Sequence, residues 1–250
     1  MIKSFFEYIN ESFSGGLDTT GYAKDVIKIT KKLDNSDDSY TEIRELEYND
    51  KNKFDLVIQI KKTENPNFET DSHFNELQWE EINFENYGFA IDANTFIDRE
   101  DLLIPEIIVT LIIDPSREPD LYKELEFKLV DIIAHELNHT NQIGYNREPF
   151  NTRPSAGSIR DDANTSFKYF MLPDEVESIV VGLYTRSKEE GIEIDKLFDK
   201  YLIPFVQDNK LTQKEYITIF SEWLKYTLEN YPDAELSTSN PIVSKIVNSI

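Results

Sequence analysis

The chain has 250 residues, 39% of them hydrophobic, which is enough for one domain with a sizeable core. It carries 48 acidic and 26 basic residues, so its formal net charge is −22. A surface this negative repels nucleic acid and anionic membranes, and we expect neither as a partner. The absence of cysteine excludes disulfide bonds and thiolate metal sites, which leaves His, Asp and Glu as metal ligands.

The first residues contain no apolar run of signal-peptide length. The most apolar stretches, residues 104–113 and 129–134, are too short to cross a bilayer. The expected location is therefore the cytoplasm.

A short amphipathic helix is predicted at the N-terminus, where Phe5, Phe6, Ile9 and Phe13 recur at helical spacing. A glycine pair at 15–16 breaks this pattern, so we interpret residues 1–16 as a helical arm. A second helix is predicted over residues 22–33.

The residue pattern then changes from a helical to an extended period. Residues 40–48 and 54–62 flank a polar turn and alternate in hydrophobicity, which predicts a β-hairpin. Residues 77–91 are rich in aromatic side chains and predict one or two strands around Gly88. Residues 105–113 are dense in β-branched side chains and predict another strand.

From Pro119 the pattern is helical again. Asp120 is the predicted N-cap of a helix that extends to residue 139, because apolar residues recur near the helical period. The polar stretch 145–164 is predicted to be a long loop. Further helices are predicted at 173–188, 194–205 and 212–230.

These elements predict an α+β fold in which a small N-terminal antiparallel or mixed sheet packs on a C-terminal helical half. The predicted domain covers residues 17–232, with a mainly β half at 17–118 and a helical half at 119–232. Residues 233–250 are predicted to be a polar tail.

The pattern that carries chemistry is His135-Glu136-Leu137-Asn138-His139, within the predicted 120–139 helix. Two histidines four residues apart lie on one helical face, about one turn apart, and can bind the same Zn²⁺ ion. Glu136 lies beside that face, where a carboxylate can take a proton from a zinc-activated water. The alternative is a pair of helical histidines that merely border the core.

A catalytic zinc usually has three protein ligands and one open position. A carboxylate is the economical third ligand, and the predicted helix from Pro173 supplies candidates. Glu175 lies one turn before Ile179 and can face the interior, whereas Glu177 points elsewhere on the helical wheel and Asp174 lies at the helix end.

The HExxH sequence, followed some 35 residues later by a glutamate-bearing helix, resembles the gluzincin branch of the zincin metallopeptidases. That resemblance implies a zincin-like fold, Zn²⁺ as cofactor, His135, His139 and Glu175 as metal ligands, and Glu136 as the general base. Glu175 fits because Ser178 stands in the small position three residues later. The chain departs from the family in lacking a later oxyanion-stabilising histidine and in having Ile179 where an Asp is common.

Residues 135–142 and 173–184 are also similar to uncharacterised metallopeptidase-like proteins of tailed bacteriophages. A phage protein would be located in the host cytoplasm or in the virion. The resemblance implies a zinc metallopeptidase that cleaves a peptide or protein substrate. A peptidase with one dedicated protein substrate, of the antitoxin-like or repressor-cleaving kind, is a further hypothesis. The alternative is a catalytically inactive zincin-fold protein with a structural or interaction role in a phage.

Several other residues are secondary candidates. Tyr145, Arg160 and Tyr184 are the candidates for stabilising an oxyanion, and Asp131, one turn before His135, is a candidate for orienting an imidazole. The strand at 107–113 has two interpretations, a buried core strand or an edge that binds an extended peptide by strand addition.

Overall fold

The computed structural model describes residues 19–33, 41–48, 53–66, 84–96, 106–142 and 165–247. The chain divides into two compact units, Met1–Thr140 and Asn141–Ile250. The predicted α+β class is confirmed. The arm predicted at 1–16 and the loop predicted at 145–164 lie outside the described residues. Within the described part of the chain, no helix is long and apolar enough to cross a membrane.

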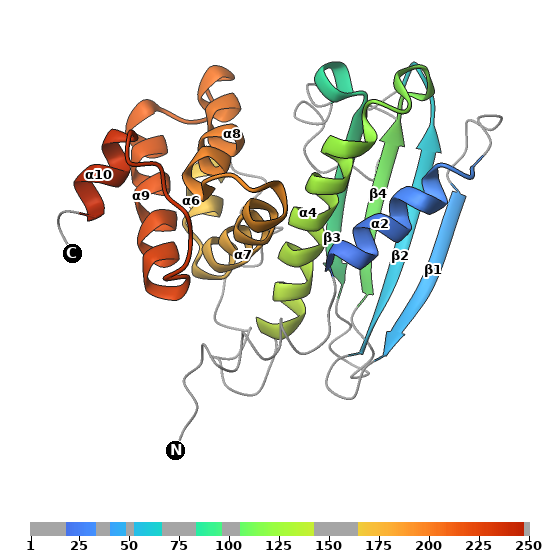
Figure 1. Ribbon diagram of the computed structural model, residues 1–250, viewed down its shortest axis with the longest axis horizontal. Coiled ribbons are helices and arrows are strands. Elements are labelled where there is room, and N and C mark those ends of the chain that lie inside the picture. The colour runs from blue at the N-terminus through green and yellow to red at the C-terminus, as the bar shows by residue number, and fades with distance from the viewer. Residues whose placement is uncertain are drawn as a thin grey trace. The chain divides into compact units, whose positions relative to one another are not determined.

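The first unit contains a four-stranded mixed sheet in the order β1-β2-β4-β3 (Figure 1). Its strands are β1 (Thr41–Tyr48), β2 (Lys53–Lys62), β3 (Phe89–Phe96) and β4 (Glu106–Ile113). β1 and β2 are antiparallel, which confirms the predicted hairpin, and β3 is antiparallel to β4. β2 and β4 are parallel, so the chain crosses over between them.

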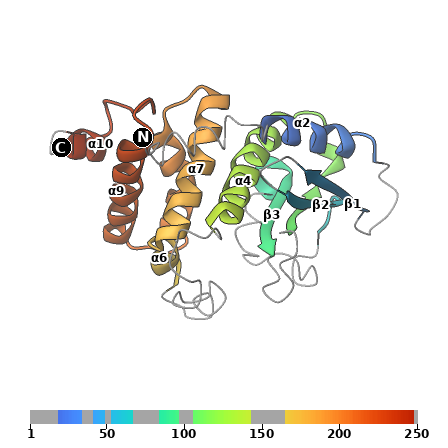
Figure 2. The same ribbon diagram turned by 90° about the horizontal axis from the view of Figure 1, so that it is seen from below.

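Two helices, α2 (Thr19–Thr30) and α4 (Tyr122–Gln142), cover one face of this sheet, as Figures 1 and 2 both show. The core between the sheet and these helices is built from alternate residues of the inner strands and from the apolar stripes of both helices. Its largest contributors include Leu56, Ile58, Ile60, Ile107, Val109, Leu111, Leu125, Leu129, Ile133 and Leu137. Fully burying each such side chain contributes about 1.5–3 kcal/mol.

The helix α4, which carries the HExxH sequence, belongs to the same compact unit as the sheet. The physical reason is that α4 buries its apolar stripe against the strands.

The strand β4 lies in the interior of the sheet. It is hydrogen-bonded to β2 on one side and to β3 on the other, and most of its side chains are buried. Its opposite face is also covered, since Ile112 packs with Phe84 and Ala90. The interpretation of residues 107–113 as a strand-addition edge is therefore wrong, and the core-strand interpretation is confirmed.

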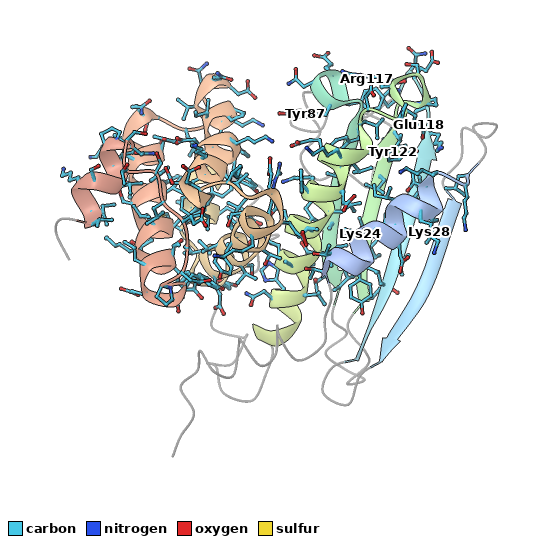
Figure 3. The ribbon with its side chains drawn as sticks, viewed as in Figure 1. Lys24, Lys28, Tyr87, Arg117, Glu118 and Tyr122 are labelled. Atoms are coloured by element: carbon cyan, nitrogen blue, oxygen red, sulfur yellow. The ribbon has the colours of Figure 1, made fainter. Side chains whose placement is uncertain are left out.

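A turn at Gly88 leads into β3. Residues 84–87 form one helical turn, and Gly88 has a φ of +77°, a left-handed conformation that glycine adopts without steric cost. The strand predicted within 77–91 therefore begins only at Phe89. Gly88 also lies against Arg117, whose guanidinium donates hydrogen bonds to the carbonyls of residues 84, 85 and 86 (Figure 3).

A small ionic cluster lies where the chain enters α4. Lys62 is nearly inaccessible, with 4% of its side chain exposed, and its Nζ lies 2.8 Å from Oε1 of Glu118. The hydroxyl of Tyr122 donates to the same carboxylate, as Figure 3 indicates by the placement of Glu118 and Tyr122. α4 begins at Tyr122, two residues after the predicted N-cap Asp120.

The second unit is helical and is built on an aromatic core. Its helices are α6 (Thr165–Phe170), α7 (Pro173–Glu190), α8 (Ile194–Gln207), α9 (Gln213–Asn230) and α10 (Pro241–Val247). Trp223 is fully buried, its ring is edge-on to Phe170 and Phe198, and its Nε1 donates to the carbonyl of Phe170 at 3.1 Å. The predicted helices at 173–188, 194–205 and 212–230 are confirmed.

The segment after α9 is attached to α8 by a buried carboxylate. Asp195, in the first turn of α8, accepts hydrogen bonds from the backbone N–H of Ser237 at 2.7 Å and from Nδ2 of Asn240 at 3.3 Å. The predicted polar tail at 233–250 contains α10, whose Val243 is buried.

Candidate metal centre

The histidine pair lies near the C-terminal end of α4. His135 and His139 are four residues apart on one helical face, and both are partly exposed beside buried neighbours. Their Nε2 atoms are 3.0 Å apart, and their ring centroids are 4.7 Å apart. The expectation that the two imidazoles converge is therefore met in the structure.

The 3.0 Å separation suits a shared cation. Two nitrogens bound tetrahedrally to zinc at about 2.0–2.1 Å from the ion are about 3.3 Å apart, so a few tenths of an ångström would open the pair to zinc geometry. Without a cation, the same distance fits one neutral imidazole donating to the other. The last turn of a helix also favours positive charge, because the helix dipole is negative there.

Glu136 lies beside the histidines and is held by the sheet. It is 7% exposed, and its Oε2 lies 2.7 Å from the hydroxyl oxygen of Thr95 on β3. Its other carboxylate oxygen, Oε1, is 3.8 Å from Nε2 of His135. One oxygen is thus hydrogen-bonded to the strand while the other lies on the side of the imidazoles.

Thr95 was not among the residues singled out from the sequence. Its place follows from the strand period: Ile91, Ala93 and Thr95 alternate onto the face of β3 that packs in the core with α4. The signal in the sequence was a hydroxyl-bearing residue that follows two apolar residues at strand spacing. Finding it required the strand boundaries and the pairing of β3, which the sequence did not provide.

The predicted third ligand, Glu175, lies in the first turn of α7, where the positive end of the helix dipole favours a carboxylate. Glu175 and Glu177 are both buried. Glu177 lies near Tyr231, and its charge contributes to raising the pKa of that phenol, for which burial is the larger cause. Two residues along a helix correspond to about 200°, so Glu175 points away from the Tyr231 side.

The side chains of His135 and His139 in the first unit and of Glu175 in the second are of the types that could hold a metal ion. The donor set fits zinc, because two neutral imidazole nitrogens and one carboxylate oxygen are the ligands of many catalytic zinc sites and leave a fourth position open. Comparison of the chain with known protein families, curated proteins and solved structures gives no match. The chemistry of these side chains is therefore the support for a metal site.

The structure gives a partner for each of two secondary candidates, Asp131 and Tyr184. Asp131 is buried, and its Oδ2 lies 3.0 Å from Nζ of Lys128. The hydroxyl of Tyr184 donates to the carboxylate of Asp233, at 2.8 and 2.9 Å from its two oxygens. Burial and this bond raise the pKa of Tyr184 well above its ordinary value. Tyr145 and Arg160 lie outside the described residues.

Proposed function

We propose that this protein is a zinc-dependent metallohydrolase, and specifically a metallopeptidase. His135, His139 and Glu175 are the proposed metal ligands and Glu136 is the proposed general base. The observation that carries the proposal is the convergence of the two Nε2 atoms, 3.0 Å apart, next to a buried carboxylate whose Oε1 is 3.8 Å from one of them.

Zinc bound by these residues would lower the pKa of water towards about 7 and polarise the carbonyl of the scissile peptide bond. Glu136 takes one proton from the attacking water and later passes it to the leaving amine. Its position on the helix that carries both histidines fixes its distance from them, and burial removes the competition of bulk water for its carboxylate. The substrate class is a peptide or protein.

The metal assignment is tested by measuring zinc content and affinity. Structural zinc sites bind with about 10–16 kcal/mol from four ligands, so each ligand contributes about 3 kcal/mol, or roughly 100-fold in affinity. His139→Ala and Glu175→Ala should each lose roughly that factor. Glu177→Ala is the matched control, a buried carboxylate on the same helix, and should keep its affinity within a few-fold. Loss in Glu177→Ala instead would move the ligand to that residue.

The hydrolase assignment is tested with Glu136→Gln. This variant should retain zinc, because Glu136 is not a ligand, and should lose peptide cleavage by roughly 10²–10⁴-fold, the usual contribution of a general base. A chelator should abolish the activity of the wild type, and added zinc should restore it. The assay uses zinc-loaded full-length chain and a library of quenched fluorescent peptides.

The same experiment identifies the alternative. The wild type could bind zinc and still be as inert as Glu136→Gln on the library. In that case Glu136→Gln is used to capture proteins, and the wild type is tested for cleavage of what is captured. This test decides between a dedicated peptidase and an interaction protein. Failure of the wild type to cleave a captured partner would refute the peptidase.

A further inference from the structure

We propose that Thr95 is a positioning residue for Glu136, one that makes the two oxygens of the carboxylate inequivalent. Its hydroxyl is bonded to Oε2 and thereby leaves Oε1 as the oxygen that receives the proton. This inference rests on the proposed function, because it assigns the geometry of the proposed general base.

The contact joins two elements that are distant in sequence. Thr95 is the last residue but one of β3, an outer strand of the described sheet, and Glu136 lies in α4. The hydroxyl oxygen of Thr95 lies 2.7 Å from Oε2 and 3.2 Å from the backbone carbonyl oxygen of Glu136. One side chain of the sheet therefore contacts both the carboxylate and the backbone of the same residue.

A hydroxyl has one proton to donate, and here it has two acceptors. The carboxylate is the closer and, when ionised, the stronger acceptor, so the proton points to Oε2. That oxygen is then occupied, whereas Oε1 lies 3.8 Å from Nε2 of His135 and is directed to the side where a ligand of the histidines would lie. The rotamer of Glu136 is fixed by this bond.

The assignment balances through the reaction. An O–H bond of the attacking water breaks as an Oε1–H bond forms, and the electron pair of that O–H bond stays on the water oxygen that attacks the carbonyl carbon. Later the Oε1–H bond breaks as an N–H bond forms on the leaving amine, while the scissile C–N bond breaks and its electron pair stays on that nitrogen. Oε2 accepts the hydrogen bond of Thr95 before, during and after these transfers, so the carboxylate keeps one orientation throughout.

A purely structural role is the competing explanation, since the same contact also ties β3 to α4. The variants Thr95→Val, Thr95→Ala and Thr95→Ser separate the two. Valine keeps the β-branched shape and removes only the hydroxyl. Serine keeps the hydroxyl and loses the methyl group. Thr110→Val is the matched control, because Thr110 is a buried strand threonine whose hydroxyl bonds Gln59 on the opposite face of the sheet.

We expect Thr95→Val to lower kcat by about 10–100-fold, the usual cost of removing a group that orients a catalytic side chain, with KM and zinc content unchanged. Thr95→Ala should lower kcat by a similar factor. Thr95→Ser should restore kcat to within a few-fold of the wild type, and Thr110→Val should leave it unchanged. A wild-type kcat in Thr95→Val, or a serine variant as slow as the valine variant, would overturn the proposal.

A second readout does not depend on turnover. Isotope-edited infrared spectra of zinc-loaded protein labelled at glutamate carboxylates, taken as wild type minus Glu136→Gln, isolate the carboxylate stretch of Glu136. That band should shift in Thr95→Val and stay in place in Thr110→Val. An unshifted band means that Thr95 does not hold the carboxylate. A wild type that cleaves neither the peptide library nor a captured partner, together with a shifted band, would refute the proposed function while leaving the hydrogen bond established.

Discussion

Replacing Gly88 with alanine should destabilise the unit that contains the sheet through two separable effects. The φ of +77° at Gly88 is a conformation that costs an L-residue about 1–2 kcal/mol. An added Cβ would also lie 2.7 Å from Cδ of Arg117, closer than real Cβ atoms approach, and 3.1 Å from its Cβ, which is a tight contact. Arg117 would have to move, and its guanidinium would leave the three carbonyls that it now contacts.

The second effect is smaller than three full hydrogen bonds. Two of the three carbonyl contacts are solvent-exposed, so water replaces them, and we assign about 1–2 kcal/mol to the loss of the set. Gly88→Ala should therefore cost about 2–4 kcal/mol in the wild-type background, which places it in the range of clearly destabilising mutations. An Arg117→Ala background removes the 2.7 Å contact with Cδ and keeps the 3.1 Å contact with Cβ, so backbone strain of about 1–2 kcal/mol is the main cost there.

A double-mutant cycle measures this difference. Chemical denaturation of the four proteins gives the free energies of unfolding, and amide hydrogen exchange in β3 and β4 identifies the transition of their unit. The free energy of unfolding that the double variant loses should be about 1–2 kcal/mol smaller than the sum of the losses in the two single variants. Equal costs of Gly88→Ala with and without Arg117 would refute the steric reasoning and leave backbone strain as the whole effect.

Three further predictions concern stability. Glu118→Gln should lower the free energy of unfolding by about 2–3 kcal/mol, less than the loss of a fully buried partner because 23% of the Glu118 side chain is exposed. Lys62→Met should cost less than Glu118→Gln, and denaturant midpoints measure both variants. Phe170→Ala should cost about 3–5 kcal/mol, because the ring is buried against the other aromatic rings of its unit, and chemical denaturation measures this loss. The hydrogen bond from Tyr184 lowers the pKa of Asp233. Ionised Asp233 therefore stabilises the folded protein at pH values above the pKa that this carboxyl has in the unfolded chain, and this stabilisation is lost as the pH falls through its folded-state pKa. Asp233→Asn should therefore lower the melting temperature slightly near neutral pH and match the wild type in strong acid.

The helices were predictable because their apolar residues follow the helical period closely. The stripe formed by Leu125, Leu129, Ile133 and Leu137 predicts α4, and the structure buries every one of these side chains. The first-turn proline of α7 and the end of that helix before Gly191 were readable for the same reason, since both are local signals.

The sheet was only partly predictable, because strand order is not a local property. The alternation at 54–62 predicts the hairpin, but nothing in the sequence near Ile107 indicates that β4 pairs with β2 in parallel and lies inside the sheet. For the same reason, the role of Thr95 could not be predicted from the sequence. Its contact with Glu136 spans 41 residues and depends on β3 lying beside β4.

The bonds that Asp195 accepts from Ser237 and Asn240 have a practical consequence for anyone who shortens this chain. A truncation at residue 232, where the sequence suggests that the domain ends, would remove both donors. The carboxylate of Asp195, which is 1% exposed, would then lose these two hydrogen bonds. Such a deletion should yield poorly behaved, aggregation-prone material, whereas trimming that spares residues 233–247 should preserve expression and solubility.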